Sequence, residues 1–123
     1  MSRGLVLIVE DDGDLRDVLS ELYATADEEC LAVGSLRALE QDAGRALSAD
    51  LAILDINLGP EQPSGVDVYD WLNEHRFRGR VVFLTGHATS HPAVQEAIRR
   101  GNVVLRKPIA PAELLRLARD SCR

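Results

Sequence analysis

Short aliphatic runs alternate along the chain with segments whose apolar positions recur at helical spacing. Five runs have the length of a strand: Leu5–Val9, Cys30–Val33, Leu51–Leu54, Val81–Leu84 and Val103–Leu105. They are too short for helices and are apolar at almost every position. This is the pattern of strands that are buried on both faces of a sheet.

The segments between these runs carry helix signals. Apolar residues at i, i+3, i+4 and i+7 predict a helix after the first run, with Asp12 or Asp14 as its N-cap. The later helices are marked by Ser35 with Leu36, Leu39 and Leu47; by Val68, Trp71 and Leu72; by Ser90, Pro92 and Gly101; and by Pro111 with Leu114, Leu115 and Leu117.

Alternating buried strands and helices predict an α/β domain. Because crossovers between parallel strands are right-handed, the pattern favours a doubly wound five-stranded parallel sheet with five helices. The 123 residues have the size of one domain, so we expect a single domain over residues 1–123 with no output domain in this chain.

Composition is ordinary for a globular protein, with 46% hydrophobic and 28% charged residues. No apolar run approaches the length of a membrane span, and the N-terminus lacks a signal sequence. Cys30 and Cys122 are isolated and match no metal or redox pattern. These features predict a cytoplasmic protein with no membrane association.

The net charge of −6 is unevenly distributed. Residues 1–55 sum to −9 and residues 56–123 to +3. The acidic balance and the lack of a recognition-helix motif argue against direct nucleic-acid binding. Residues 99–123 hold an excess of five bases, which fits either a face for an acidic partner or arginines that solvate a helix end.

Polar residues follow four of the five predicted strands. They are Glu10-Asp11-Asp12, Asp55, Thr85 and Lys107, the only lysine in the chain. In an open parallel sheet, ligands bind at the carboxyl ends of the strands, so we expect these groups to converge there. Clustered carboxylates favour a hard cation such as Mg²⁺. Asp55 could then attack phosphorus, while Lys107 and Thr85 neutralise and bind the transferring phosphoryl group.

The ordered set of motifs resembles the receiver domain of two-component response regulators, which has a flavodoxin-like fold. The motifs are Val9-Glu10-Asp11-Asp12 with Leu15-Arg16, Leu54-Asp55-Ile56-Asn57-Leu58, Leu84-Thr85-Gly86-His87 and Lys107-Pro108. The resemblance covers the whole chain.

The resemblance implies a role for each matching residue. Asp55 is the phospho-acceptor, and Glu10 and Asp11 form the acidic pair that organises Mg²⁺. Asp11, Asp55 and the backbone carbonyl of Asn57 would be the direct metal ligands. Thr85 would be the switch hydroxyl and Lys107 the essential lysine, with a cis peptide bond to Pro108. Asp12 is interpreted as a helix cap.

The implied function is a phosphorylation-dependent switch, not a turnover enzyme. A histidine kinase or a histidine phosphotransfer protein would supply the phosphoryl group. A downstream protein partner would bind the face made by the helix from Pro92, the strand Val103–Leu105 and the last helix, and this face could also form a homodimer. An enzyme is disfavoured because Asn57 stands where an aspartyl-phosphate hydrolase would carry a second acid, and because no G-x-G-x-x-G follows the first strand.

Three features depart from the family pattern. Val104 stands where an aromatic residue is common, which leaves open a phosphorylation-independent interaction module. The loop from Gly59 to Gly65 is longer than usual; we interpret it as a surface insertion, with altered kinase docking as the alternative. His87 could influence phosphoryl lifetime or be an exposed loop residue, whereas His75 and His91 are expected to be solvated.

Overall fold

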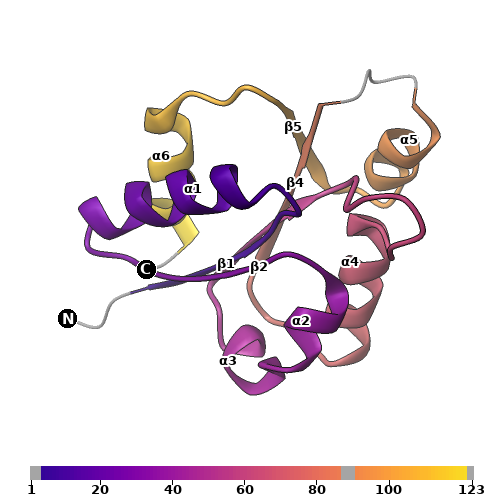
Figure 1. The fold of residues 1–123 in the computed structure, drawn as a ribbon, viewed down its shortest axis with the longest axis horizontal. Coiled ribbons are helices and arrows are strands. Elements are labelled where there is room, and N and C mark those ends of the chain that lie inside the picture. Colours follow the sequence, from indigo (N-terminus) through magenta and orange to yellow (C-terminus); the bar gives the residue numbers. More distant parts are fainter. Residues whose placement is uncertain (1–3, 87–90, 122–123) are drawn as a thin grey trace.

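All five predicted strands are present and form one parallel sheet. The computed structural model describes residues 4–86 and 91–121. The strands are β1 (Leu5–Val9), β2 (Glu29–Val33), β3 (Leu51–Asp55), β4 (Arg80–Thr85) and β5 (Val103–Arg106). Their order is β2-β1-β3-β4-β5, and each neighbouring pair is parallel (Figure 1). The doubly wound α/β fold expected from the sequence is confirmed.

Helices cover both faces of the sheet. They are α1 (Gly13–Thr25), α2 (Leu36–Glu40), α3 (Ala43–Leu47), α4 (Gly65–Glu74), α5 (Pro92–Arg99) and α6 (Pro111–Ser121). In Figure 1, α1 and α6 lie together on one side, and α2 to α5 lie on the other. No helix among the described residues is long and apolar enough to cross a bilayer.

The second predicted helix differs from the expectation. The sequence indicates one helix carrying Leu36, Leu39 and Leu47, but the structure contains two short helices, α2 and α3. Asp42 separates them with φ −131° and ψ 39°, outside the helical region, and its side chain makes no cap hydrogen bond. The described residues therefore form six helices instead of five.

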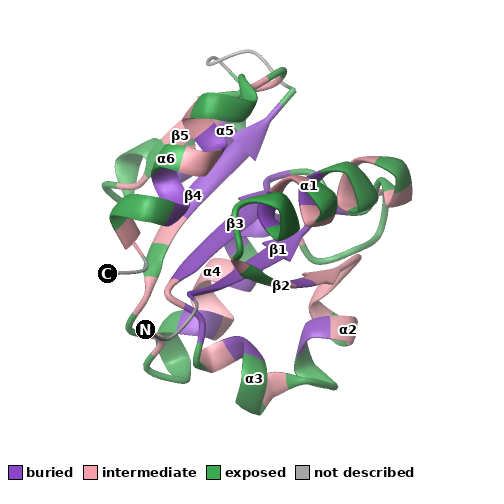
Figure 2. Cartoon of the chain, turned by 90° about the vertical axis from the view of Figure 1, so that its left-hand side faces the viewer, coloured by how far each residue is buried: buried purple, intermediate pink, exposed green. Residues whose placement is uncertain are grey.

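The apolar core lies in two layers, one on each face of the sheet. Of the three inner strands, β1 and β3 are buried at every position, whereas β2 and β5 at the edges are partly exposed (Figure 2). One layer joins Leu19 and Tyr23 of α1 to Leu114 of α6. The other is larger and packs α2 to α5 against the opposite face. This arrangement explains why the strand sequences lack polar alternation.

Local signals place the helix ends. The Asp12 side chain accepts hydrogen bonds from the N–H groups of Asp14 and Leu15 and caps α1, as predicted. Ser64 and Asp67 form a reciprocal capping box at the start of α4. Ser35 caps α2 as expected, whereas Ser90 lies outside the described residues.

The two ends of α5 are also defined locally. His91 caps its start, where Nδ1 accepts a hydrogen bond from the N–H of Ala93, and Pro92 is the first helical residue. Gly101 follows the helix with φ 81°, the left-handed conformation that commonly ends a helix. Both predicted helix boundaries, Pro92 and Gly101, are confirmed.

Candidate functional site

The topology brings the polar strand ends to one edge of the sheet. Val9 pairs with Val33 on one side and Leu54 on the other, so Glu10 and Asp55 emerge at neighbouring positions. Asp55 is in register with Leu84, and Thr85 follows it at the end of β4. Lys107 comes directly after β5. The four predicted strand ends therefore meet, as the parallel order requires.

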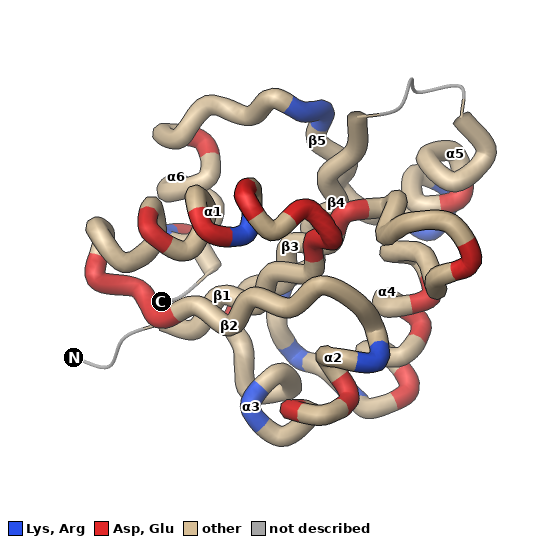
Figure 3. Tube along the Cα trace, in the orientation of Figure 1, with Lys and Arg blue, Asp and Glu red and all other residues tan. Residues whose placement is uncertain are grey.

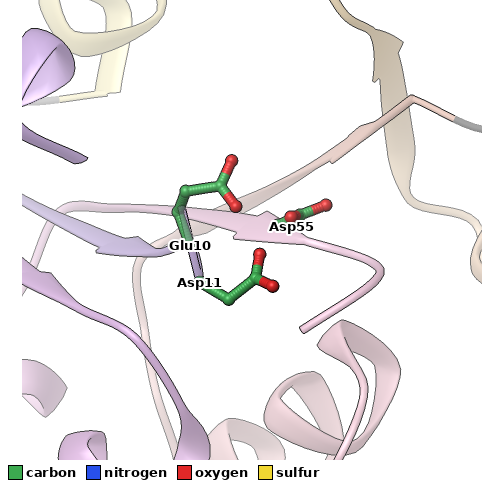
Figure 4. Close-up of side chains that lie close together, drawn as sticks. All are labelled: Glu10, Asp11 and Asp55. Atoms are coloured by element: carbon green, nitrogen blue, oxygen red, sulfur yellow. The ribbon is translucent and has the colours of Figure 1, made fainter. Parts of the chain in front are cut away.

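Three carboxylates form a compact acidic cluster at this edge. Glu10, Asp11 and Asp55 each offer an oxygen, and these oxygens all lie within 4.8 Å of one another. Figure 4 shows the three side chains close together at the ends of β1 and β3. Glu10 is only 2% exposed and Asp55 only 5%, whereas Asp11 is exposed. Acidic positions likewise gather between β1 and α1 in Figure 3.

Lys107 supplies a positive charge to this cluster. Its Nζ donates to Glu10 Oε1 at 2.6 Å and to Asp55 Oδ2 at 3.3 Å. Burial by itself would lower the pKa of the Lys107 ammonium. The hydrogen bond to Glu10 and the negative charges of Asp55 and Glu10 outweigh it, so the pKa is raised and the ammonium stays charged.

The two acids after β1 are harder to ionise than ordinary carboxyls. Burial raises the pKa of Glu10, and the hydrogen bond and charge of Asp55 raise it further against the opposing effect of Lys107. Partial desolvation of its carboxyl group, together with the hydrogen bond and charge of the neighbouring Glu10, raises the pKa of Asp11. Crowded carboxylates that resist ionisation are stabilised by an added cation. The cluster therefore has the chemistry of a site for a hard divalent ion.

The loop after β3 completes one wall of the site. The N–H of Asn57 donates to Asp55 Oδ1 at 3.3 Å, and Asn57 Oδ1 accepts from the N–H of Gly59 at 3.0 Å. The base of the loop is closed where the N–H of Gly65 donates to the Ile56 carbonyl at 2.8 Å. The open hollow so formed has a volume of about 430 Å³ and is lined by Glu10, Asp11, Asp12, Asp55, Asn57, Gly86 and Lys107.

Thr85 lies buried at the end of β4, with 1% of its surface exposed. Its carbonyl accepts the N–H of Lys107 at 2.8 Å, which joins β4 to the start of the Lys107-Pro108 segment. The peptide bond between Lys107 and Pro108 is cis, as the resemblance implies. His87 lies outside the described residues.

The remaining sequence expectations have mixed outcomes. Val104 is half-buried and packs against the larger apolar layer, as expected of a strand residue. His91 is exposed, but it also caps α5. His75 is exposed as well, although its ring stacks on Trp71 with a centroid separation of 4.1 Å.

Arg16 contacts the site in a way that its place in the Leu15-Arg16 motif does not predict. In the structure, Nη1 of Arg16 donates to the carbonyl oxygen of Glu10 at 2.7 Å. The spacing of six residues from the first acid was the available signal. It did not reveal that the contact would be with the backbone.

Comparison with known proteins places these features in context. Residues 6–119 match the family described as the response regulator receiver domain. Nodulation protein W of Bradyrhizobium diazoefficiens is 31% identical over 115 residues, which cover 93% of this chain and 49% of that protein. The chain thus spans about half the length of this curated relative.

Solved structures show the same fold. A CheY-like receiver domain from Methanospirillum hungatei superposes with a TM-score of 0.82 at 22% identity, covering 97% of this chain and 93% of its own. CheY4 of Vibrio cholerae gives a TM-score of 0.81 at 24% identity, with 98% and 99% covered.

Proposed function

This chain belongs to the response regulator receiver family, and on that basis we propose that it is a phosphorylation-dependent switch with Asp55 as its phospho-acceptor. The observation that carries the proposal is the position of the Asp55 carboxylate. It lies at the end of a buried strand, next to two further acids and within hydrogen-bond distance of the Lys107 ammonium. Receiver domains are signalling modules that interact with histidine kinases.

The proposed reaction is a transfer between two nucleophiles. A carboxylate oxygen of Asp55 attacks phosphorus, a new P–O bond forms, and the P–N bond to the donor phosphohistidine breaks. The histidine nitrogen keeps the electron pair and takes a proton, and Asp55 becomes an acyl phosphate. Lys107 offsets the negative charge of the phosphoryl oxygens, and the Thr85 hydroxyl donates a hydrogen bond to one of them.

A divalent cation fits the donor set of this site. Glu10, Asp11 and Asp55 supply clustered carboxylate oxygens, which suit a hard ion such as Mg²⁺, and the carbonyl of Asn57 would add a neutral oxygen. Glu10 would act by orienting the ion, whereas Asp11 and Asp55 would bind it directly. When bound, the ion supplies positive charge that stabilises the transferring phosphoryl group.

The partners follow from this chemistry. A histidine kinase or a histidine phosphotransfer protein would supply the phosphoryl group in the cytoplasm. A downstream protein, or a second copy of this chain, would bind the face made by α5, β5 and α6. Ile98 and Val103 are exposed on that face at 45% and 42%. Arg99 and Arg100 pair with Glu96, and Arg116 pairs with Glu113, so part of the basic charge is locally offset.

A second candidate is a module that binds partners without phosphorylation. Val104 favours this module, because the position at which the family commonly has an aromatic residue carries no ring that could move together with Thr85 on phosphorylation. The cluster of Asp55, Glu10 and Lys107 favours the first proposal, since burying charges without using them costs stability.

Intact-mass measurement tests the phospho-acceptor directly. The wild type, Asp55→Asn and Asp14→Asn proteins are treated with acetyl phosphate and Mg²⁺, with and without EDTA. We expect one Mg²⁺-dependent phosphoryl adduct on the wild type and on Asp14→Asn, which changes an exposed acid outside the site, and none on Asp55→Asn. An adduct that persists on Asp55→Asn contradicts the assignment. A wild type that neither acetyl phosphate nor a histidine kinase labels supports the phosphate-independent module.

A further inference from the structure

We propose that Arg16 is a positioning residue that fixes the peptide carrying the acidic pair, and so sets the affinity of the site for Mg²⁺. The inference rests on the proposed function only where it concerns Mg²⁺. Arg16 does not itself bind the metal, because its contact is with the backbone of Glu10.

Arg16 donates the hydrogen bond to the Glu10 carbonyl that a backbone N–H of the next strand would otherwise supply. The N–H of Glu10 donates to the Val33 carbonyl at 3.0 Å and extends the ladder between β1 and β2 by one residue. The next donor in a parallel ladder would be the N–H of Ser35, but the chain turns there and Ser35 caps α2. No backbone N–H among the described residues donates to the Glu10 carbonyl. Nη1 of Arg16 donates to it instead, at 2.7 Å.

Gly34 makes room for the guanidinium. A Cβ on Gly34 would lie 2.9 Å from Nη1 of Arg16, closer than a normal contact, whereas a Cβ on Gly13 would lie at an ordinary contact distance of 3.4 Å from Nη2. The half-buried arginine therefore crosses from α1 to the end of β2 over backbone that carries no side chain.

The consequence for the site comes through a single peptide plane. The carbonyl of Glu10 and the N–H of Asp11 belong to the same rigid peptide plane. A hydrogen bond to that carbonyl therefore also fixes the position of the Asp11 backbone nitrogen and Cα. The Glu10 side chain is already held by Lys107 at 2.6 Å, whereas Asp11 is exposed. Arg16 thus holds the acid that has the fewest other restraints.

Calorimetric Mg²⁺ titration of variants tests this role. Groups that orient metal ligands typically change affinity at least tenfold, so we expect Arg16→Met to raise the Mg²⁺ Kd about tenfold. Arg16→Lys keeps one donor and should recover part of the affinity. Arg119→Met makes the same change of charge at an exposed position on α6 and should keep the wild-type Kd.

Gly34→Ala provides a second test that keeps Arg16. The new methyl group comes too close only to the far end of the Arg16 side chain, because its backbone neighbour, the Glu10 carbonyl oxygen, lies at an ordinary contact distance of 3.8 Å. The fold should therefore survive while the guanidinium is displaced. We expect the Kd to rise in Gly34→Ala with little change in the urea midpoint. In the Arg16→Met background, Gly34→Ala should add nothing further, because the displaced group is gone. Independent, additive effects would overturn the proposal.

The outcomes separate this inference from the proposed function. A wild type that binds Mg²⁺ and accepts phosphate, together with Arg16→Met of unchanged Kd, overturns the role of Arg16 alone. If the wild type binds no Mg²⁺, the proposed metal site fails, and hydrogen exchange of the metal-free protein decides the role of Arg16. Faster exchange of the Glu10 amide in Arg16→Met and Gly34→Ala, but not in Arg119→Met, supports it. Unchanged exchange overturns it.

Discussion

Lys107 lies between two carboxylates that approach it from different strands. Glu10 reaches the ammonium at 2.6 Å and Asp55 at 3.3 Å. A single ammonium on a flexible stem can lie between two oxygens in this way. A planar guanidinium distributes its charge over a wider fork and does not fit the same position.

Exchanging Lys107 for arginine should therefore impair the chemistry although the charge is kept. We expect Lys107→Arg to slow Mg²⁺-dependent labelling of Asp55 by acetyl phosphate about tenfold or more, as for other lost oxyanion contacts. Time-resolved intact mass measures the rate. Arg106→Lys makes the reverse exchange at the exposed neighbour and should label at the wild-type rate. Equal rates for Lys107→Arg and the wild type would contradict the role of the ammonium.

Asp11 should destabilise the metal-free protein at neutral pH. Its pKa is raised by partial desolvation and by Glu10, so the folded state binds the proton more tightly than the unfolded chain does. The stability that this group contributes is present when it is protonated and is lost as the pH rises through the folded pKa. Asp11→Asn should then raise the urea midpoint at neutral pH, and the gain should vanish below the ordinary pKa of an Asp carboxyl.

Mg²⁺ provides the complementary measurement for Asp11. A ligand at ten times its Kd stabilises the folded state by about 1.4 kcal/mol, so Mg²⁺ should raise the unfolding free energy of the wild type by that amount. Asp11→Asn should lose most of this response. Asp14→Asn, an exposed change in the first turn of α1, should keep it and should not raise the midpoint. A wild-type response in Asp11→Asn would contradict the ligand assignment.

The strand ends were predictable from the sequence, but the contacts among them were not. Buried runs followed by Glu10, Asp55, Thr85 and Lys107 place these residues at one edge, because parallel strands all end there. Which carboxylate Lys107 contacts more closely depends on side-chain length and rotamer. The contact of Arg16 with a backbone carbonyl depends on the turn at Ser35, which no apolar spacing encodes.

At the scale of elements, α4 begins directly against the strand that carries Asp55. A Cβ on Gly65 would lie 2.2 Å from the Asp55 carbonyl oxygen, a backbone atom that cannot move without moving the site. Gly65 is therefore required by close approach rather than by a positive φ. In the sequence, Gly65 follows the long loop and is therefore not distinguishable from the other turn residues there.

Gly65→Ala should consequently destabilise the fold. We expect a loss of about 2 kcal/mol or more in the free energy of unfolding, as for other overpacked positions. Gly44→Ala is the matched control, since a Cβ there meets nothing within 4 Å. It should raise stability by up to about 1 kcal/mol through helix propensity. Urea unfolding measures both, and equal effects of the two substitutions would contradict the close-approach argument.

The division of the second helix into α2 and α3 was not predictable from spacing alone. Leu36, Leu39 and Leu47 fit one helical face, and the apolar pattern gives no sign of the break at Asp42. Both halves still bury an apolar residue, Leu39 and Ala46, in the same layer. Tertiary packing is satisfied by two short helices as well as by one.

At the scale of the whole molecule, one sheet separates two apolar layers that must be lost together. Leu19 belongs to the layer under α1 and α6, whereas Trp71, the only tryptophan, packs against the other layer. Leu19→Ala removes a side chain that is 3% exposed and should cost about 2–5 kcal/mol.

Cooperative unfolding makes Trp71 a reporter of that distant change. In Leu19→Ala, the urea midpoints from Trp71 fluorescence and from far-UV circular dichroism should fall together and remain coincident. A fluorescence midpoint that stays at the wild-type value while the dichroism midpoint falls would mean that the two layers unfold separately.

The closed base of the loop after β3 has a consequence for engineering and for evolutionary drift. Leu58 is buried, Gly65 is bonded to Ile56, and residues 60–63 between these anchors are exposed. Lengthening a flexible loop costs only about 0.6 kcal/mol for each doubling. The tip can thus gain residues without displacing Asp55. Residues 60–63 are therefore a suitable place to graft an epitope or a fluorescent probe next to the acidic cluster without changing any of its residues.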